Sequence, residues 1–191
     1  MKIYTRKGDD GTTGLLYGGR VAKDSAFPAA YGTVDEAQAV IGVARAHSER
    51  GGELDGLLIG LERDLWVLMA ELATDPSNRH KLSAGQNLVT DEMVTALEAM
   101  IDDLDARFES PTEFVVPGED RVAAFLDLAR TVVRRSERDA ITAFAVAADE
   151  GSPIEGSFAI AYLNRLSDLL WTMARWQEGS SRPSRSSLPE P

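Results

Sequence analysis

Four arginines that stand close together are the side chains of this sequence best placed to do chemistry: Arg130, Arg134, Arg135 and Arg138. Three of them are spaced i, i+4 and i+8, so on a helix they form one row of like charges. Such neighbours cost about 0.2–0.5 kcal/mol per pair when no anion lies between them. A planar guanidinium donates paired hydrogen bonds that suit phosphate. The row therefore predicts a binding site for a compact anion.

An ordinary solvated helix face is the alternative interpretation of these arginines. Asp127 and Glu137 stand three residues from Arg130 and Arg134, a spacing at which helical ion pairs form. However, the arginines outnumber these acids and lie beside the apolar stripe of the helix, which predicts a boundary where a ligand or another subunit packs. Asp35 is a natural partner for one arginine, across or within a chain, unless it serves only the dipole of its own helix.

A second candidate anion site is the glycine-rich segment at residues 1–32. Closely spaced glycines let backbone N–H groups turn toward phosphate oxygens, and threonine and lysine side chains add donors. The segment is not a Walker A loop, because the stretch from Gly14 to Arg20 lacks the Lys-Ser/Thr ending and follows no strand. A flexible loop without a ligand is the alternative.

Composition limits the partners that the anion sites could serve. The chain has 191 residues and a net charge of −11, which argues against a general binder of nucleic acid or anionic membranes. It has no cysteine, so disulfides, thiolate nucleophiles and cysteine-based metal sites are excluded. His47 and His80 are isolated, which disfavours a carboxylate-bridged metal site. We find no secretory signal or membrane span, and expect a cytoplasmic protein.

The elements that must position these residues are helices. Apolar residues recur at helical spacing in five stretches, and Thr33 and Glu36 match a capping box before the first of them. Thr90 is expected to cap the third helix. The pattern predicts an all-α five-helix bundle with helices at about 34–48, 54–74, 91–109, 119–149 and 157–177.

The domain organisation follows from the same pattern. Residues 1–178 form one domain, with a loop at 1–32 and a helical bundle at 33–178, and residues 179–191 have the composition of a disordered tail. A short extended piece containing Phe114 precedes the fourth helix. Phe114 is either a core aromatic or a functional one, and Asn164 and Asp168 on the last helix are either surface polar residues or part of a site.

Taken in order, five segments resemble the PduO-type ATP:cob(I)alamin adenosyltransferases. The resemblance covers residues 3–177. It departs from the family pattern at Glu119, where a second glycine is common, at Asp35–Gln38, where an asparagine-containing sequence is usual, and at Phe27–Pro28, where charge is frequent. The segments that carry it are Thr5–Lys23, Ala30–Glu36, Phe114–Gly118, Ala129–Arg138 and Tyr162–Asp168.

The resemblance implies a homotrimer of five-helix bundles that binds ATP and cobalamin near subunit interfaces. Arg130 would form a salt bridge with Asp35 between subunits, and Phe114 would cover the lower face of the corrin and ease its reduction to Co(I). Arg134, with Glu137 and Asn164, would position ATP, and Mg²⁺ would sit on its phosphates. The triphosphate would be wrapped by the N-terminal loop through Thr5, Arg6, Gly8, Asp9, Gly11, Thr13 and Lys23.

The implied reaction is attack of cobalt on the 5′ carbon of ATP, with triphosphate as the leaving group. Cobalt supplies the nucleophile, which agrees with the lack of a nucleophile–histidine pair in the sequence. A cob(II)alamin reductase and an adenosylcobalamin-dependent mutase are the expected protein partners. Two alternatives remain: a helical enzyme that transfers phosphoryl groups from ATP, and a bundle that only binds a corrinoid or nucleotide.

Overall fold

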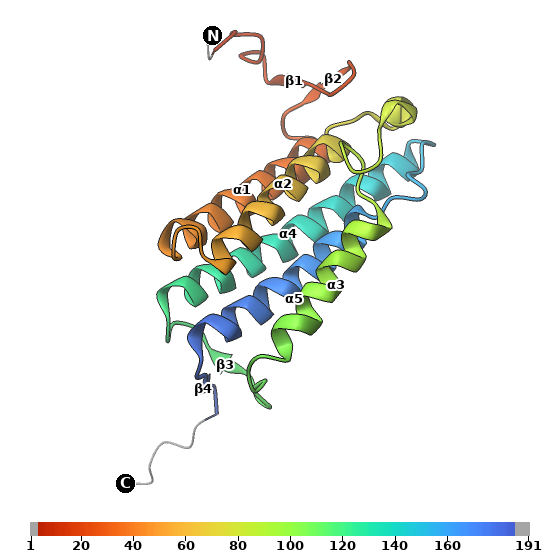
Figure 1. The fold of residues 1–191 in the computed structure, drawn as a ribbon. Helices are drawn as coiled ribbons and strands as arrows, with labels where there is room; N and C mark the ends of the chain where they lie inside the picture. Colours follow the sequence, from red (N-terminus) through yellow and green to blue (C-terminus); the bar gives the residue numbers. More distant parts are fainter. Residues whose placement is uncertain (1–3, 186–191) are drawn as a thin grey trace.

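The computed structural model describes residues 4–185 and contains five long α-helices (Figure 1). The predicted five-helix fold is therefore confirmed. A short 3₁₀ helix, η1 (Pro76–Lys81), follows the second long helix. The long helices are α1 (Ala26–His47), α2 (Glu53–Leu72), α3 (Asp91–Asp105), α4 (Arg121–Asp149) and α5 (Ala159–Glu178).

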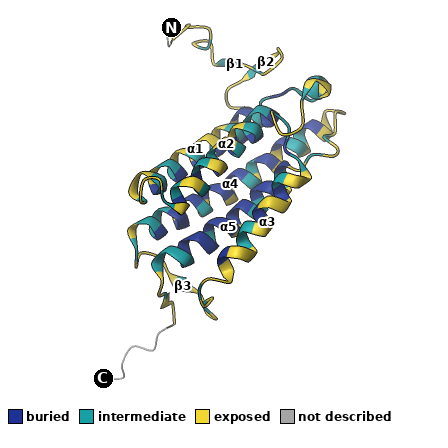
Figure 2. Ribbon diagram, in the orientation of Figure 1, coloured by how far each residue is buried: buried dark blue, intermediate teal, exposed yellow. Residues whose placement is uncertain are grey.

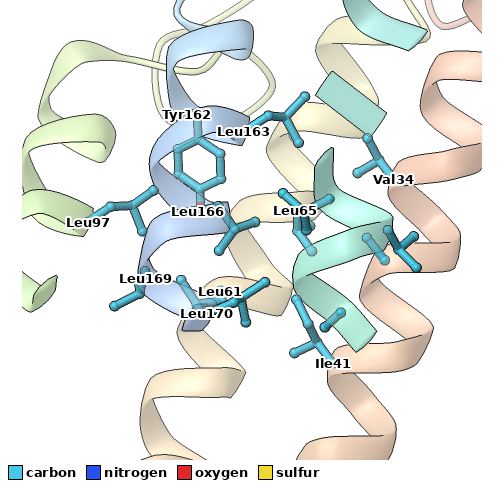
Figure 3. Close-up of a cluster of buried hydrophobic side chains, with 14 of the residues drawn as sticks. Val34, Ile41, Leu61, Leu65, Leu97, Tyr162, Leu163, Leu166, Leu169 and Leu170 are labelled. Atoms are coloured by element: carbon cyan, nitrogen blue, oxygen red, sulfur yellow. The ribbon is translucent and has the colours of Figure 1, made fainter. Parts of the chain in front are cut away.

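The helix α4 lies between α1 and α5, while α2 packs on α1 and α3 packs on α5. Each helix turns its apolar stripe inward, so buried residues follow the inner faces of the bundle (Figure 2). Leu61 and Leu65 of α2, Ile41 of α1 and Leu166 of α5 meet in this core (Figure 3). The bundle is thus a rigid frame on which the loops at its two ends are held.

Two short antiparallel ribbons lie at opposite ends of the bundle (Figure 1). The strand β1 (Thr12–Gly14) pairs with β2 (Arg20–Ala22) in the N-terminal loop. The strand β3 (Val115–Val116) pairs with β4 (Arg182–Pro183) beyond the end of α5. The β4 pairing differs from the predicted tail, because backbone groups of residues 182–184 find partners beside β3. Residues 1–3 and 186–191, on which the loop and tail predictions also bear, lie outside the described residues.

The predicted start of the first helix is wrong. The helix begins at Ala26, with Ser25 as its N-cap, so Thr33 lies inside it. The Thr33 hydroxyl donates to the Ala29 carbonyl at 2.8 Å and contacts Asp139 Oδ2 on α4 at 2.6 Å. Pro28 resembles a helix breaker, but it lies in the first turn of the helix. Backbone N–H groups there have no partner within the helix, so proline is tolerated.

Two helix starts follow from local capping. The Thr90 side chain accepts from the Met93 N–H at 3.4 Å, which confirms the predicted cap of α3. Asp120 caps α4 by accepting from the Ala123 N–H at 2.9 Å. No helix within residues 4–185 is long and apolar enough to cross a membrane.

The half-buried carboxyl of Asp64 gives the fold a pH dependence. Burial raises its pKa above the ordinary value of 3.8, although a hydrogen bond from the Tyr162 hydroxyl opposes the shift. The folded state therefore binds more protons than the unfolded state, and the free energy of unfolding falls as pH rises from about 3.8 through the raised pKa. We expect Asp64→Asn to remove this part of the decline in the free energy of unfolding, measured by urea denaturation from pH 3 to pH 7.

Asp55 provides a control of opposite sign for that experiment. A hydrogen bond from the Gly51 N–H and the charge of Arg45 lower the pKa of Asp55. Its contribution to stability is present above the ordinary pKa and is lost as pH falls, so Asp55→Asn should weaken the protein mainly near neutral pH. Equal pH profiles for the two variants would contradict the assignment.

Candidate functional site

The predicted site has two halves, the glycine-rich loop and the segment that contains Phe114. Within one chain these halves lie at opposite ends of the helical bundle. Contacts of Thr33 with Asp139 and of Glu36 with Arg135 show that α1 and α4 run antiparallel. The glycine-rich loop precedes α1, whereas Phe114 precedes α4, so they occupy opposite ends of the bundle (Figure 1). With 29 residues, α4 alone is about 43 Å long. A single chain therefore does not bring the loop and Phe114 together.

The N-terminal loop is folded around its glycines. Gly11 adopts a φ of 82°, which a residue with a Cβ rarely adopts, and its carbonyl accepts from the Lys23 N–H at 2.9 Å. A Cβ added at Gly8 would lie 3.0 Å from Lys23 Nζ and 3.1 Å from the Thr12 carbonyl oxygen. The structure thus brings Gly8, Gly11 and Lys23 together, as an anion-binding loop requires.

Arg20 holds this loop in shape, a role that the sequence did not indicate. Its Nη2 donates to the Lys7 carbonyl at 2.6 Å and its Nε donates to Thr12 Oγ1 at 3.0 Å. Asp10 accepts from the Thr12 N–H at 3.0 Å. The hydrogen bonds from Thr12, together with the charge of Arg20, lower the pKa of Asp10. The pairing of β1 with β2 creates these contacts, and residue spacing alone does not reveal it.

The remaining loop residues predicted to bind are accessible. Thr5, Arg6 and Asp9 are exposed, and Thr13 is half-buried in β1. The guanidinium of Arg6 lies over the Tyr4 ring, 5.7 Å from its centroid. Their roles toward a nucleotide stay predictions.

The arginines of α4 have different surroundings. Arg135 forms an ion pair with Glu36 on α1, and Arg138 donates to the Arg134 carbonyl at 2.8 Å. The side chain of Arg134 is exposed and has no hydrogen-bond or ion-pair partner among residues 4–185. The alternative pairing of Arg134 with Glu137 is absent from this part of the chain. Arg134 is therefore the member of the row whose guanidinium is open to an anion.

Arg130 meets a different acid from the one predicted for the assembled protein. Its Nε lies 3.4 Å from Asp127 Oδ1 on the same helix, which is the alternative i, i+3 pair. Asp35 is exposed on α1, and residues 4–185 of this single chain contain no ion-pair partner for it. The predicted Arg130–Asp35 bridge joins two subunits, so it stays a prediction.

Glu137 and Asn164, both predicted to position a nucleotide, lie side by side. Asn164 Nδ2 donates to Glu137 Oε1 at 3.2 Å across α4 and α5. Arg165 donates to Asn164 Oδ1 at 3.2 Å and also to Asp168 at 3.2 Å. Arg165 thereby orients the amide of Asn164, and Asp168 belongs to the same network. The packing of α5 on α4 creates this pair.

Phe114 is not a core residue. Its side chain is 86% exposed, so the alternative of a core aromatic is wrong. The Ser184 N–H donates to the Phe114 carbonyl at 2.7 Å, and Arg182 pairs with Glu119 at 2.9 Å, which holds the segment in place. Phe114 and Arg130 line one cavity of about 530 Å³. An exposed aromatic ring at the edge of a cavity is suited to a flat apolar ligand.

Asp127 and Arg175, which line the same cavity, form a buried ion pair that the sequence did not predict. Arg175, only 2% exposed, donates to Asp127 at 2.6 Å and to Glu178 at 3.0 Å. Helical spacing puts Arg175 on the face of α5 that also carries Asn164, yet the structure buries its side chain. Asp127 of α4 explains the difference, because it supplies the charge that permits a buried guanidinium.

Known proteins share both the sequence pattern and the fold. Residues 3–177 match the family model of cobalamin adenosyltransferases. A corrinoid adenosyltransferase from Citrobacter freundii is 41% identical over 177 residues, covering 93% of this chain and 95% of the relative. The corresponding enzyme of Bacillus subtilis is 37% identical over 179 residues, covering 92% of this chain and 86% of the relative.

A solved structure agrees with these relatives. It is a PduO-type ATP:corrinoid adenosyltransferase from Lactobacillus reuteri, a phenylalanine-to-histidine variant complexed with cobalamin and ATP. It aligns with a TM-score of 0.83 at 26% identity, covering 97% of each chain. Similarity of this extent in sequence and in fold shows that the chain belongs to the PduO-type cobalamin adenosyltransferase family.

Proposed function

We propose that this protein transfers the 5′-deoxyadenosyl group of ATP to cob(I)alamin, forming adenosylcobalamin and releasing triphosphate. The observation that carries the proposal is the exposed ring of Phe114 beside a cavity that Arg130 also lines. An aromatic ring held in this way fits one face of a corrin. The guanidinium of Arg134 has no hydrogen-bond or ion-pair partner among residues 4–185, stands one helical turn from Glu137 of the Glu137–Asn164 pair, and fits a phosphate of ATP.

The chemistry asks little of the protein beyond alignment and charge stabilisation. A bond forms between cobalt and the 5′ carbon, the bond from that carbon to the phosphate oxygen breaks, and triphosphate leaves with the electron pair. Cobalt provides the nucleophilic pair, so no side chain has to act as a base. Arg134 stabilises the charge that develops on the leaving group, while Glu137 and Asn164 hold the nucleotide in line.

The N-terminal loop is the proposed cradle of the triphosphate. Backbone N–H groups around Gly8 and Gly11, with the Lys23 ammonium, would surround the phosphates. Thr5, Arg6, Asp9 and Thr13 complete the proposed set. Mg²⁺ on the phosphates of ATP would neutralise part of their charge. No cluster of three or more potential metal-ligating side chains occurs in residues 4–185.

A homotrimer is the proposed assembly, since the family resemblance implies that number of subunits, and the separation of the loop from Phe114 within one chain supports contact between copies. A second copy can bring the loop of one subunit to the arginines and Phe114 of its neighbour. The outer surfaces of α1 and α4 support contact between copies, since they expose Val43, Leu128 and Ile141. In this arrangement Arg130 binds Asp35 of the partner subunit as well as its own Asp127.

The test is turnover by the purified protein with ATP and chemically reduced cob(I)alamin. We expect formation of a cobalt–carbon bond and release of one triphosphate for each adenosylcobalamin. Release of ADP would instead identify a phosphoryl-transfer enzyme. Tight binding of ATP and corrinoid without product, even with a strong reductant, would identify a carrier. The reductase, the mutase and the cytoplasmic location stay predictions.

A further inference from the structure

A fully buried carboxylate lies near the end of α2, away from the arginines of α4. Glu71 has no exposed surface, and its two oxygens accept three hydrogen bonds. Oε1 accepts from Arg79 Nη2 at 2.7 Å and from Ser157 Oγ at 2.5 Å, and Oε2 accepts from the Val89 N–H at 2.8 Å. A buried charge is tolerated when it is paired and hydrogen-bonded in this way.

The three donors belong to three separate segments of the chain. Arg79 lies in η1, Val89 immediately precedes the Thr90 cap of α3, and Ser157 lies just before α5. Ser157 Oγ also accepts from the Ala159 N–H at 3.2 Å in the first turn of α5. Glu71 therefore ties the end of α2 to the connection that follows it and to the start of α5.

The same end of the bundle holds the tip of the β1–β2 hairpin (Figure 1). The Leu16 N–H donates to the Ala73 carbonyl at 2.8 Å, two residues beyond Glu71. Asn87 Nδ2 donates to the Tyr17 hydroxyl at 2.6 Å, two residues before Val89. Leu16 and Tyr17 form the turn between β1 and β2, so the loop rests on the two segments that Glu71 joins.

We propose that Glu71 is a positioning residue for the nucleotide, acting through the N-terminal hairpin. Its carboxylate sets the relative position of Ala73 and Asn87, and these two residues hold Leu16 and Tyr17. The hairpin in turn positions the part of the loop that contains Gly8, Gly11 and Lys23. These are the residues proposed to surround the triphosphate. The inference deepens the proposed function, because it rests on the loop as the ATP cradle.

Glu71→Gln tests this role with little change in shape. The amide nitrogen cannot accept from donors that now face a carboxylate oxygen, and Arg79 loses its counter-charge. We expect the KM for ATP to rise about tenfold, the amount that about 1.4 kcal/mol produces, while kcat and the KM for cob(I)alamin change by less than about twofold. Hydrogen exchange of residues 12–22 should become faster.

Two further variants separate positioning from general stability. Tyr17→Phe removes only the hydroxyl that meets Asn87, and should raise the KM for ATP in the same direction by a smaller factor. Glu62 lies on α2, as Glu71 does, and Glu62→Gln breaks an ion pair with Arg45 of α1, 3.2 Å away, so it should leave the KM for ATP unchanged. If Glu71→Gln does not fold, Tyr17→Phe carries the test.

The outcomes for the inference and for the proposed function are distinguishable. If the wild-type protein fails to bind ATP, the proposed function is wrong, whereas exchange of residues 12–22 still reports whether Glu71 holds the hairpin. If the wild-type protein binds ATP and Glu71→Gln has the same KM for ATP and the same exchange, the inference is wrong. Equal increases in the KM for ATP and for cob(I)alamin would also overturn it.

Discussion

Replacing Phe114 with alanine should reduce product formation from cob(II)alamin under mild reduction by at least about 100-fold. The ring is proposed to cover the lower face of the corrin and keep an axial ligand away from cobalt, which makes reduction to Co(I) easier. Without it, water reaches that face and the reduction becomes harder; about 2.7 kcal/mol corresponds to the expected loss. The measurement is adenosylcobalamin formed from cob(II)alamin, followed by absorbance.

The expected pattern across substrates separates this role from unfolding. The Phe114 side chain is 86% exposed, so its removal leaves no core cavity and should lower stability little. ATP binding should stay normal, and chemically pre-reduced cob(I)alamin should restore much of the activity. Trp66→Ala is a matched control, because Trp66 is a 69% exposed aromatic on α2. Unchanged activity with cob(II)alamin, or equal losses with both corrinoids, would refute the lower-face role.

Arg134→Ala should lower kcat/KM for ATP by about 10- to 100-fold. A hydrogen bond to a charged group contributes about 1.5–3 kcal/mol, and each 1.36 kcal/mol corresponds to about tenfold in rate. Because the Arg134 guanidinium has no hydrogen-bond or ion-pair partner among residues 4–185, its removal should break no such interaction within the described part of the fold. Steady-state kinetics with saturating cob(I)alamin would measure the loss.

Arg138→Ala is the control for charge, since Arg138 is exposed on the same helix and its guanidinium donates to the Arg134 carbonyl. It should retain most of the activity. Arg134→Lys should recover only part of the loss, because lysine keeps the charge but not the planar fork. If Arg134→Ala and Arg138→Ala lost activity equally, the result would point to a general electrostatic effect rather than a defined contact.

The helices were largely predictable because their signals are local. Leu61 and Leu65 of α2 and Leu166 of α5 recur at helical spacing and are buried as that spacing predicts. The Thr90 cap was also predictable, because the accepting side chain and the donating Met93 N–H lie within one turn. The start of α1 was not, since a capping-box pattern at Thr33 competed with a true start whose Pro28 resembles a helix breaker.

The candidate site was predictable as a set of residue types, but not as a set of partners. The sequence singled out Arg130, Arg134 and Phe114, and the structure places Phe114 and Arg130 on one cavity. It did not predict the buried Arg175–Asp127 pair, whose members are separated by 48 positions and meet only through the packing of α4 on α5. Glu71 was missed for the same reason.

By itself, the sequence determined that the chain forms five helices, that its candidate anion-binding groups lie on α4 and in a glycine-rich loop, and to which family it is similar. Only the tertiary structure decided which acid each arginine meets, that Phe114 is exposed, and that the two halves of the site lie at opposite ends of α4. The physical reason is range. Helical periods and caps act within a few residues, whereas ion pairs and accessibility depend on how α1 and α5 pack against α4.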